Sequence, residues 1–168
     1  MLDLMKSKIL LSFLFLAASL RAAPLVAISL PGDAKSSIAA GVALPAGRAL
    51  FWTSGTVPTP LNKDGQTVYE RYGDTHAQGV TALKNIEQVL AAQGLTLKDV
   101  VYLRVYVTPD AAKDGKPDFA GWFKAYGEFF NNEKNPAKTA RSTVGVAALV
   151  SPDWLIEIEA FAAYPLEK

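Results

Sequence analysis

The spacing of apolar and polar residues changes several times along the chain, and the first changes predict strands. Two short apolar runs, 37–44 and 49–53, flank a segment, 45–48, that contains proline and glycine. Such a segment favours a turn, so we expect a first β-hairpin here. Residues 56–69 are rich in proline, asparagine and glycine and are predicted to form a loop.

A helical period replaces this pattern from about residue 74. Apolar residues then recur three or four positions apart up to Leu90, and Gly94 lies just past the expected end of the helix. The next segment, 99–108, is apolar at most positions, as expected for a strand that is covered on both faces. A loop over 109–118 leads to a second helix, whose aromatic residues are spaced as on one helix face and predict core packing: Phe119, Trp122, Phe123, Tyr126 and Phe130.

The last part of the chain, 137–163, contains two β-branched runs joined by a Ser-Pro-Asp turn, and it predicts a terminal antiparallel pair of strands. Alternation places Arg141 on one face of its strand, together with Thr143 and Gly145, and places Glu157 on one face of the last strand. We expect one face of the pair to be core and the other to bring the guanidinium near the carboxylate. From spacing alone, a structural salt bridge on a solvated sheet face is the simpler explanation.

The predicted order of elements is β-β-α-β-α-β-β, an α+β fold with a single sheet and two helices. Each helix has one apolar stripe, so both are expected to pack on one face of the sheet. The other face lacks cover, although Tyr102, Tyr106 and Trp154 are available to line it, and a symmetric oligomer that closes sheet against sheet would bury it. The length fits one domain, which we place at 36–165.

The N-terminal residues differ in character from the rest of the chain. Two lysines precede an apolar run, 9–20, and small residues follow it, which is typical of a secretory signal peptide over 1–22. We expect cleavage near Ala22 or Ala23, and Met5 is an alternative start. The run is short for a membrane span, and a buried N-terminal helix is the competing interpretation. We therefore expect an exported, periplasmic protein that has no stable membrane association after leader cleavage.

Charge and composition disfavour several classes of function. The chain has 17 basic and 16 acidic residues, and removal of the leader leaves 14 and 15. A near-neutral domain lacks the basic patch that binding to phosphates requires, so we expect no nucleic-acid partner. The chain contains no cysteine, and its one histidine, His76, is expected on an exposed first turn of a helix. We expect neither a metal site nor a cofactor.

A series of short motifs in this order resembles one known family. The motifs are Thr53-Ser54-Gly55, then 92–101 (AQGLTLKDVV), 140–144 (ARSTV) and 155–160 (LIEIEA). Together they resemble the YjgF/UK114 family, also called the Rid or reactive intermediate deaminase family, over about residues 36–164. The resemblance implies a fold similar to one type of chorismate mutase. It also implies a homotrimer with a barrel-like centre and a ligand cleft at each subunit interface.

The resemblance implies an activity and a set of roles as well. Active members hydrolyse reactive imine or enamine acids to 2-oxo acids and ammonia, without a metal. Arg141 matches the residue that holds the substrate carboxylate through paired, charge-assisted hydrogen bonds. Glu157 matches the residue that activates a water and returns a proton to the leaving ammonia. Ser54 and Gly55 match residues that line the cleft, and backbone groups around Thr143 would contact the nitrogen or the water.

Two positions depart from the family pattern. Where active members have a tyrosine that enters the cleft, this chain has Ile38, and where they have a cleft asparagine it has Phe123. We expect both to line a substrate site that is less polar and takes a bulkier or more apolar ligand. The alternative to a deaminase is a non-catalytic trimer that binds small carboxylates or acts like a chaperone. Ribonuclease activity, also attributed to the family, is disfavoured by the near-neutral charge.

Overall fold

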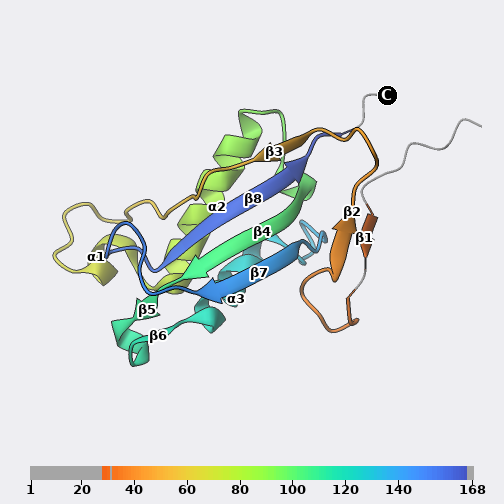
Figure 1. Cartoon of the computed structure of the whole chain (residues 1–168). Helices are drawn as coiled ribbons and strands as arrows, with labels where there is room; N and C mark the ends of the chain where they lie inside the picture. The colour runs from red at the N-terminus through yellow and green to blue at the C-terminus, as the bar shows by residue number, and fades with distance from the viewer. Residues whose placement is uncertain (1–27, 31, 166–168) are drawn as a thin grey trace, which may run out of the picture.

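Four strands form the main sheet of the molecule (Figure 1). The computed structural model describes residues 28–30 and 32–165, so the predicted leader, 1–22, lies outside the described residues. The order of the strands across the sheet is β3-β8-β4-β7. Their bounds are Leu50–Trp52 for β3, Val100–Val107 for β4, Ala140–Gly145 for β7 and Ile156–Ala163 for β8.

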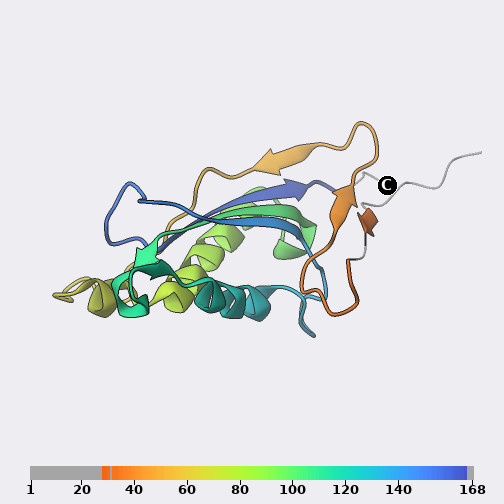
Figure 2. The same cartoon turned by 60° about the horizontal axis from the view of Figure 1, so that its bottom comes forward.

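Two helices, α2 (Thr75–Ala91) and α3 (Phe119–Phe129), cover one face of this sheet (Figure 2). The helices and the strand β4 lie where the periodicity predicts them. The α2 helix ends shortly before Gly94, whose positive φ of 70° suits glycine. This turn lets the Leu95 N–H donate to the Leu90 carbonyl, which closes the helix end. The predicted α+β fold, with one main sheet and two helices on one face, is confirmed.

The core lies between the sheet and the two helices. Leu83 and Ile86 of α2 are fully buried, as are Leu103 of β4 and Ile158 of β8 on the facing strands. Side chains alternate along β4, so its odd-numbered residues from Leu103 onward face the helices and its even-numbered residues face away. This alternation decides on which side of the sheet every paired residue lies.

The aromatic stripe of α3 is only partly core. Trp122, Tyr126 and Phe130 are fully buried, as predicted. Phe119 and Phe123 remain 37% and 48% exposed, so the prediction that all five pack in the core is wrong for these two. They lie at the flank of the helix that faces the edge strand β7, where the layer has no further strand to cover them.

The two C-terminal strands are not an antiparallel pair, contrary to the prediction. The strand β4 lies between them: β7 pairs with it in parallel, and β8 pairs with it in antiparallel fashion on the other side. Parallel pairing needs a crossover connection, which α3 supplies between β4 and β7. The residues Ile156, Ile158 and Ala160 of β8 are fully buried, and a central position gives this apolar strand neighbours on both edges.

The predicted first hairpin also differs from the structure. The strand β2 (Gly41–Ala43) pairs with β1 (Ile28–Leu30), whereas β3 pairs with β8 and extends the main sheet. Short elements occupy the predicted loop over 109–118: β5 (Pro109–Asp110), a 3-10 turn at Ala111–Lys113, and β6 (Lys116–Pro117). The helix α1 (Val68–Tyr72) begins at the end of the other predicted loop, 56–69, and a 3-10 turn at Leu97–Asp99 precedes β4. Joining β8 satisfies the backbone of β3 along the edge of the sheet.

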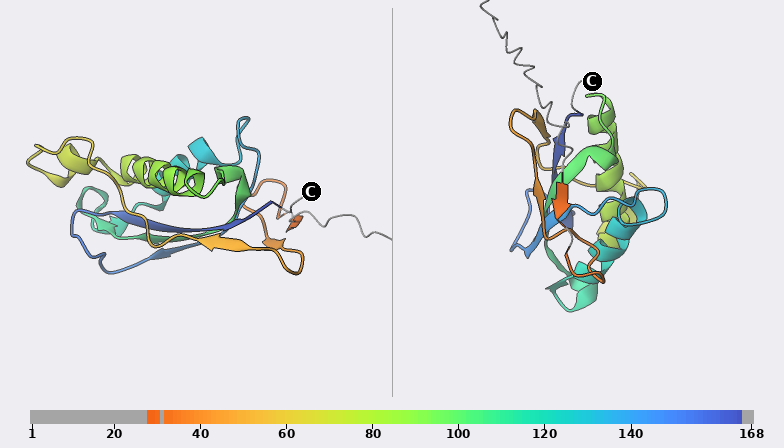
Figure 3. Two further views of the ribbon diagram at one scale, coloured as in Figure 1. Left: turned by 90° about the horizontal axis from the view of Figure 1, so that it is seen from above. Right: turned by 90° about the vertical axis from the view of Figure 1, so that its right-hand side faces the viewer.

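The face of the sheet opposite the helices has no cover within the described chain (Figure 3). Trp52 on this face is 64% exposed, and the ring of Phe161 lies 5.0 Å from its ring and 5.3 Å from that of Tyr102. Trp154, which was expected to help line this face, lies in the turn before β8 instead. Among residues 28–30 and 32–165, no helix is long and apolar enough to cross a membrane.

Candidate active site

Arg141 lies on β7 and faces α3. In the pairing with β4 it is opposite Leu103, which is fully buried on the helix side. The guanidinium carbon lies 4.4 Å from the ring centre of Tyr126, 4.8 Å from that of Phe123 and 5.5 Å from that of Trp122. Contacts with ring faces stabilise the positive charge but leave the N–H groups available to other partners.

The guanidinium of Arg141 has no anionic partner in the part of the chain that the structure describes. Its Nη1 atom is buried and forms no hydrogen bond. Burial lowers the pKa of Arg141 below its usual value, an effect that the nearby Tyr126 partly offsets. A buried charged donor that lacks an acceptor is costly. An incoming carboxylate would supply that acceptor, so the surroundings of Arg141 suit an anionic ligand.

Two further predicted site residues, Thr143 and Ile38, lie on the same side of the sheet as Arg141. Thr143, two residues along β7, accepts a hydrogen bond of 3.2 Å from the indole N–H of Trp122. Ile38 packs against the core. The Tyr126 hydroxyl donates a hydrogen bond of 3.2 Å to the carbonyl of Ser37, the residue before Ile38. These residues share the helix side of the sheet, and we call them the helix-side cluster: Arg141, Thr143, Phe123 and Ile38.

Glu157 lies on β8, on the uncovered face of the sheet. In the pairing with β4 it is opposite Tyr106. Its carboxylate packs directly on Gly55, because a Cβ atom at residue 55 would overlap the Oε1 atom of Glu157. Within the described residues this carboxylate forms no hydrogen bond and no ion pair. It is therefore available to bind a water or a ligand.

The backbone after β3 places Ser54 and Gly55 beside Glu157. The N–H of Thr56 donates to the Ile158 carbonyl at 2.8 Å, and the N–H of Ile158 donates back at 3.0 Å. The Thr56 hydroxyl also donates to the Ser54 carbonyl at 3.2 Å. These contacts fix the turn of the chain against β8. We call Glu157, Ser54 and Gly55 the sheet-side cluster.

The sheet separates these two clusters, so the expectation that one face would bring Arg141 and Glu157 together within a chain is wrong. Arg141 shares its side with Leu103, whereas Glu157 shares its side with Tyr106. Leu103 and Tyr106 are three residues apart on one strand and face opposite ways. The structural salt bridge between Arg141 and Glu157 does not form in the chain either, and one chain alone holds two halves of the predicted site.

The other carboxylate on the uncovered face, that of Glu159, is already paired. Its Oε2 atom lies 3.2 Å from Nη1 of Arg104, and its Oε1 atom accepts a hydrogen bond of 3.1 Å from the Tyr106 hydroxyl. Arg104 was not singled out in the sequence, where nothing distinguishes it from a solvated charge. Glu159 thus has a structural role, while Glu157, two residues away, keeps its oxygens free.

Sequence reasoning also missed the aromatic wall of the Arg141 site. The aromatic spacing predicts core positions for Trp122 and Tyr126, and both are buried there, but their rings also flank the guanidinium. The i, i+4 spacing of these residues indicates only that they share a helix face. β7 lies under this helix face because it pairs in parallel with β4. That pairing is a long-range contact, and the spacing of residues along the helix does not predict it.

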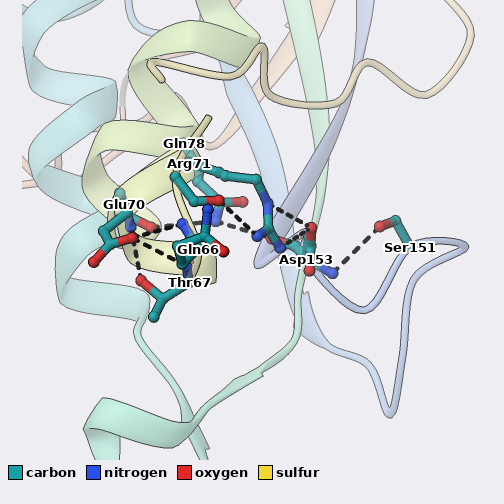
Figure 4. Close-up of polar contacts among 9 residues, drawn as sticks. Gln66, Thr67, Glu70, Arg71, Gln78, Ser151 and Asp153 are labelled. Carbon is teal, nitrogen blue, oxygen red and sulfur yellow. Dashed lines mark hydrogen bonds and ion pairs between the residues drawn. The ribbon is translucent and has the colours of Figure 1, made fainter. Parts of the chain in front are cut away.

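A polar network holds the turn that precedes Glu157 (Figure 4). The Arg71 guanidinium contacts the Asp153 carboxylate through Nη2 at 2.6 Å and Nε at 3.2 Å. The buried Gln78 side chain donates to the Asp153 carbonyl at 3.1 Å and accepts from the Leu155 N–H at 2.8 Å. These contacts tie the start of β8 to α1 and α2 and so support the position of Glu157.

Comparison with protein families finds a match over residues 40–164 to the family described as endoribonuclease L-PSP. A RutC family protein from Pyrococcus horikoshii is 38% identical over 120 residues, which cover 71% of this chain and 82% of that protein. The 3-aminoacrylate deaminase RutC from Acinetobacter baylyi is 33% identical over 121 residues, which cover 71% of this chain and 84% of that protein.

Solved structures share the fold. The Rid family protein YyfB from Yersinia pestis has a TM-score of 0.58 and 32% identity, and the match covers 76% of this chain and 87% of that one. E. coli TdcF with bound serine has a TM-score of 0.55 and 27% identity, and the match covers 78% of this chain and 97% of that one. The likeness therefore extends over most of the described chain in both sequence and fold.

Proposed function

The chain belongs to the YjgF/Rid family, and on this premise we propose that it hydrolyses reactive imine or enamine acids to 2-oxo acids and ammonia. The observation that carries the proposal is the buried Nη1 atom of Arg141, which has no acceptor. A carboxylate would satisfy it, and every substrate of this class has a carboxylate. The relative RutC from Acinetobacter baylyi is named a 3-aminoacrylate deaminase, which supports this class of reaction.

Arg141 holds and orients the substrate in this proposal. Its planar guanidinium donates two parallel hydrogen bonds to the carboxylate, and the rings of Tyr126 and Phe123 fix the plane of the guanidinium. The carboxylate then fixes the position of the adjacent C=N carbon. Orientation of this kind lowers the entropic part of the activation free energy, because binding already holds the reacting atoms in place before attack.

Glu157 acts on the water. Its free carboxylate takes a proton from a water whose oxygen attacks the C=N carbon, which gives a tetrahedral carbinolamine. Starting from the protonated imine, Glu157 then passes this proton to the nitrogen, and the C–N bond breaks to release ammonia. The oxygen gives its proton to Glu157 as the C=O bond forms, and Glu157 releases that proton to solvent. The products are the 2-oxo acid and ammonia, and an enamine acid first takes a proton at carbon to become the imine.

The complete site is formed between two copies of the chain in this proposal, with the helix-side cluster of one and the sheet-side cluster of the next. Within a single chain the sheet lies between Arg141 and Glu157. The uncovered sheet face, with Trp52 64% exposed, is the surface that assembly would bury. We take the assembly to be the homotrimer typical of the family, with three such interface clefts.

We place this activity outside the cytoplasm, in the periplasm. The proposal rests on the lysines, the apolar run and the small residues of the predicted leader over 1–22. Expression of the full chain, followed by fractionation and N-terminal sequencing, tests it. A mature start near Ala23 in the periplasmic fraction supports export, and an intact N-terminus in the cytoplasmic fraction overturns it.

The proposed reaction is tested by following the decay of imines. An amino-acid oxidase generates imines from a panel of amino acids, and semicarbazide traps what remains. We expect the protein to accelerate decay, and Arg141→Ala and Glu157→Gln each to lower kcat/KM by about 100-fold or more. Glu159→Gln is the matched control, because Glu159 lies on the same strand and face but is paired to Arg104; its kcat/KM should stay within about threefold of wild type.

The same assay distinguishes the enzyme from a binding protein. If no imine decays faster, the deaminase proposal fails for these substrates. Saturable binding of a carboxylate that is lost in Arg141→Ala, without turnover, would then identify the non-catalytic alternative.

A further inference from the structure

Two phenylalanine rings on α3 remain exposed near the guanidinium of Arg141, whose Nη1 atom has no hydrogen-bond partner. Phe119 is 37% exposed and Phe123 is 48% exposed, although the rest of the aromatic stripe is fully buried. The two residues are four apart, so their rings lie one above the other along the helix. Large apolar side chains that stay exposed as a group on a folded domain commonly mark a contact surface.

The rings follow the row of side chains on β7. The ring of Phe123 lies 4.8 Å from the guanidinium carbon of Arg141. At the other end of the row, a Cβ atom at Gly145 would lie 3.7 Å from Cζ of Phe119 and 3.1 Å from the ring of Pro117. Gly145 has no side chain, so only the rings of Pro117 and Phe119 lie over the far end of this row. Thr143 lies between Arg141 and Gly145, and its hydroxyl already accepts a hydrogen bond from Trp122.

The arrangement combines a partly buried guanidinium with two exposed aromatic rings. The Nη1 atom of Arg141 lacks a hydrogen-bond acceptor, and the rings beside it offer only van der Waals and ring-face contacts. A small polar side chain on the ligand would find no hydrogen-bond partner among these rings. A large apolar side chain would cover them and remove their surface from water.

We propose that the ligand of this site is a 2-imino acid whose side chain is aromatic, with its carboxylate on Arg141 and its ring on Phe123 and Phe119. The inference rests on the proposed function for the identity of the reacting group and adds the class of side chain. An aromatic ring fits better than a branched aliphatic chain, because offset or edge-to-face contacts with phenylalanine add to the gain from burial.

The experiment compares imines derived from phenylalanine and alanine. We expect kcat/KM for the phenylalanine imine to be at least about tenfold higher, which corresponds to about 1.4 kcal/mol. Phe123→Asn should reduce this ratio to near one. Val89→Asn is the matched control: Val89 is an exposed apolar residue, 41% exposed, on the other helix, and its variant should keep the ratio.

Binding is measured beside turnover so that the two proposals fail separately. The probes are 3-phenylpyruvate and pyruvate, titrated by calorimetry into wild type, Arg141→Ala and Phe123→Asn. We expect 3-phenylpyruvate to bind at least about tenfold more tightly to wild type, with the difference lost in both variants. The mass of each variant in solution is also compared with that of wild type.

Each outcome decides one of the two proposals or both. Turnover with equal or reversed preference overturns the aromatic ligand and leaves the deaminase. Selective binding of 3-phenylpyruvate without turnover overturns the deaminase and leaves the aromatic ligand. If the protein shows no turnover and no selective binding, both proposals are overturned. A change of mass in Phe123→Asn would assign the ring to contacts between copies of the chain and also overturn the aromatic ligand.

Discussion

The position of the Glu157 carboxylate depends on the absence of a side chain at residue 55. In Gly55→Ala the new Cβ atom would overlap Oε1 of Glu157, so the carboxylate must move. A misplacement of about 1 Å in a catalytic group can lower a rate by on the order of 100-fold. We expect kcat to fall at least tenfold, while the free energy of unfolding changes by less than about 0.5 kcal/mol, because only the end of a flexible side chain is displaced.

Imine turnover and urea unfolding measure these two effects in one variant. Gly127→Ala is the control: this glycine lies in α3, and a Cβ there would meet no atom within 4 Å. It should keep kcat and stabilise the helix by about 0.5–1 kcal/mol. Unchanged kcat in Gly55→Ala would mean that the observed position of the Glu157 carboxylate is not the working one.

At the scale of elements, one side chain of α2 holds the turn that leads into β8. Gln78 is fully buried, donates to the carbonyls of Gly73 and Asp153, and accepts from the N–H of Leu155. Gln78→Leu preserves the approximate volume but leaves these buried backbone groups without partners. We expect a loss of about 2–4 kcal/mol in the free energy of unfolding, since each unsatisfied group costs about 1–3 kcal/mol.

Urea unfolding of Gln78→Leu and Gln88→Leu checks this prediction. Gln88 lies on the same helix but is exposed, so its variant should differ from wild type by less than about 0.5 kcal/mol. Similar losses in the two variants would show that the network of Gln78 contributes no more than an exposed glutamine.

Most helices and strands were predictable from the sequence, but the pairing of the strands in the sheet was not. The apolar spacing up to Leu90, followed by Gly94, specifies α2 locally, and the apolar run of β4 is equally clear. The local spacing of residues does not predict that β7 runs parallel to β4, or that β4 lies between β7 and β8. Two apolar runs joined by a short turn usually form a hairpin. Here Ile156 and Ile158 are fully buried because β8 takes a central position in the sheet instead of pairing with β7.

The candidate site was predictable residue by residue but not as an arrangement. Alternation grouped Arg141 with Thr143 correctly, because the parity of a strand is a local property. Which of its two faces meets the helices depends on register with a strand more than thirty residues away. Both charged residues could therefore be identified from the sequence, but their separation by the sheet could not be predicted.

At the scale of the whole molecule, a shared site makes a prediction about mixed assemblies. Arg141→Ala and Glu157→Gln are each expected to be inactive alone. When the two are unfolded together and refolded in equal amounts, about a quarter of the interfaces receive Arg141 from one chain and Glu157 from the next, since each partner is drawn at random. We expect about a quarter of wild-type kcat per site, measured with the imine assay.

Separately refolded variants mixed without exchange of subunits are the control and should stay inactive. Activity that remains at background after joint refolding, in an assembly of wild-type mass, would contradict a site shared between chains. It would require Arg141 and Glu157 to act within one chain, across the sheet that separates them.

The separation of the two clusters by β4 has a consequence for how such a protein can evolve. Substitutions on α3 alter what lies beside Arg141, but within the same chain they leave the face that holds Glu157 unchanged. A lineage can thus exchange the ring of Phe123 for another side chain and acquire a new ligand in one step, while the residues that act on water are inherited unchanged.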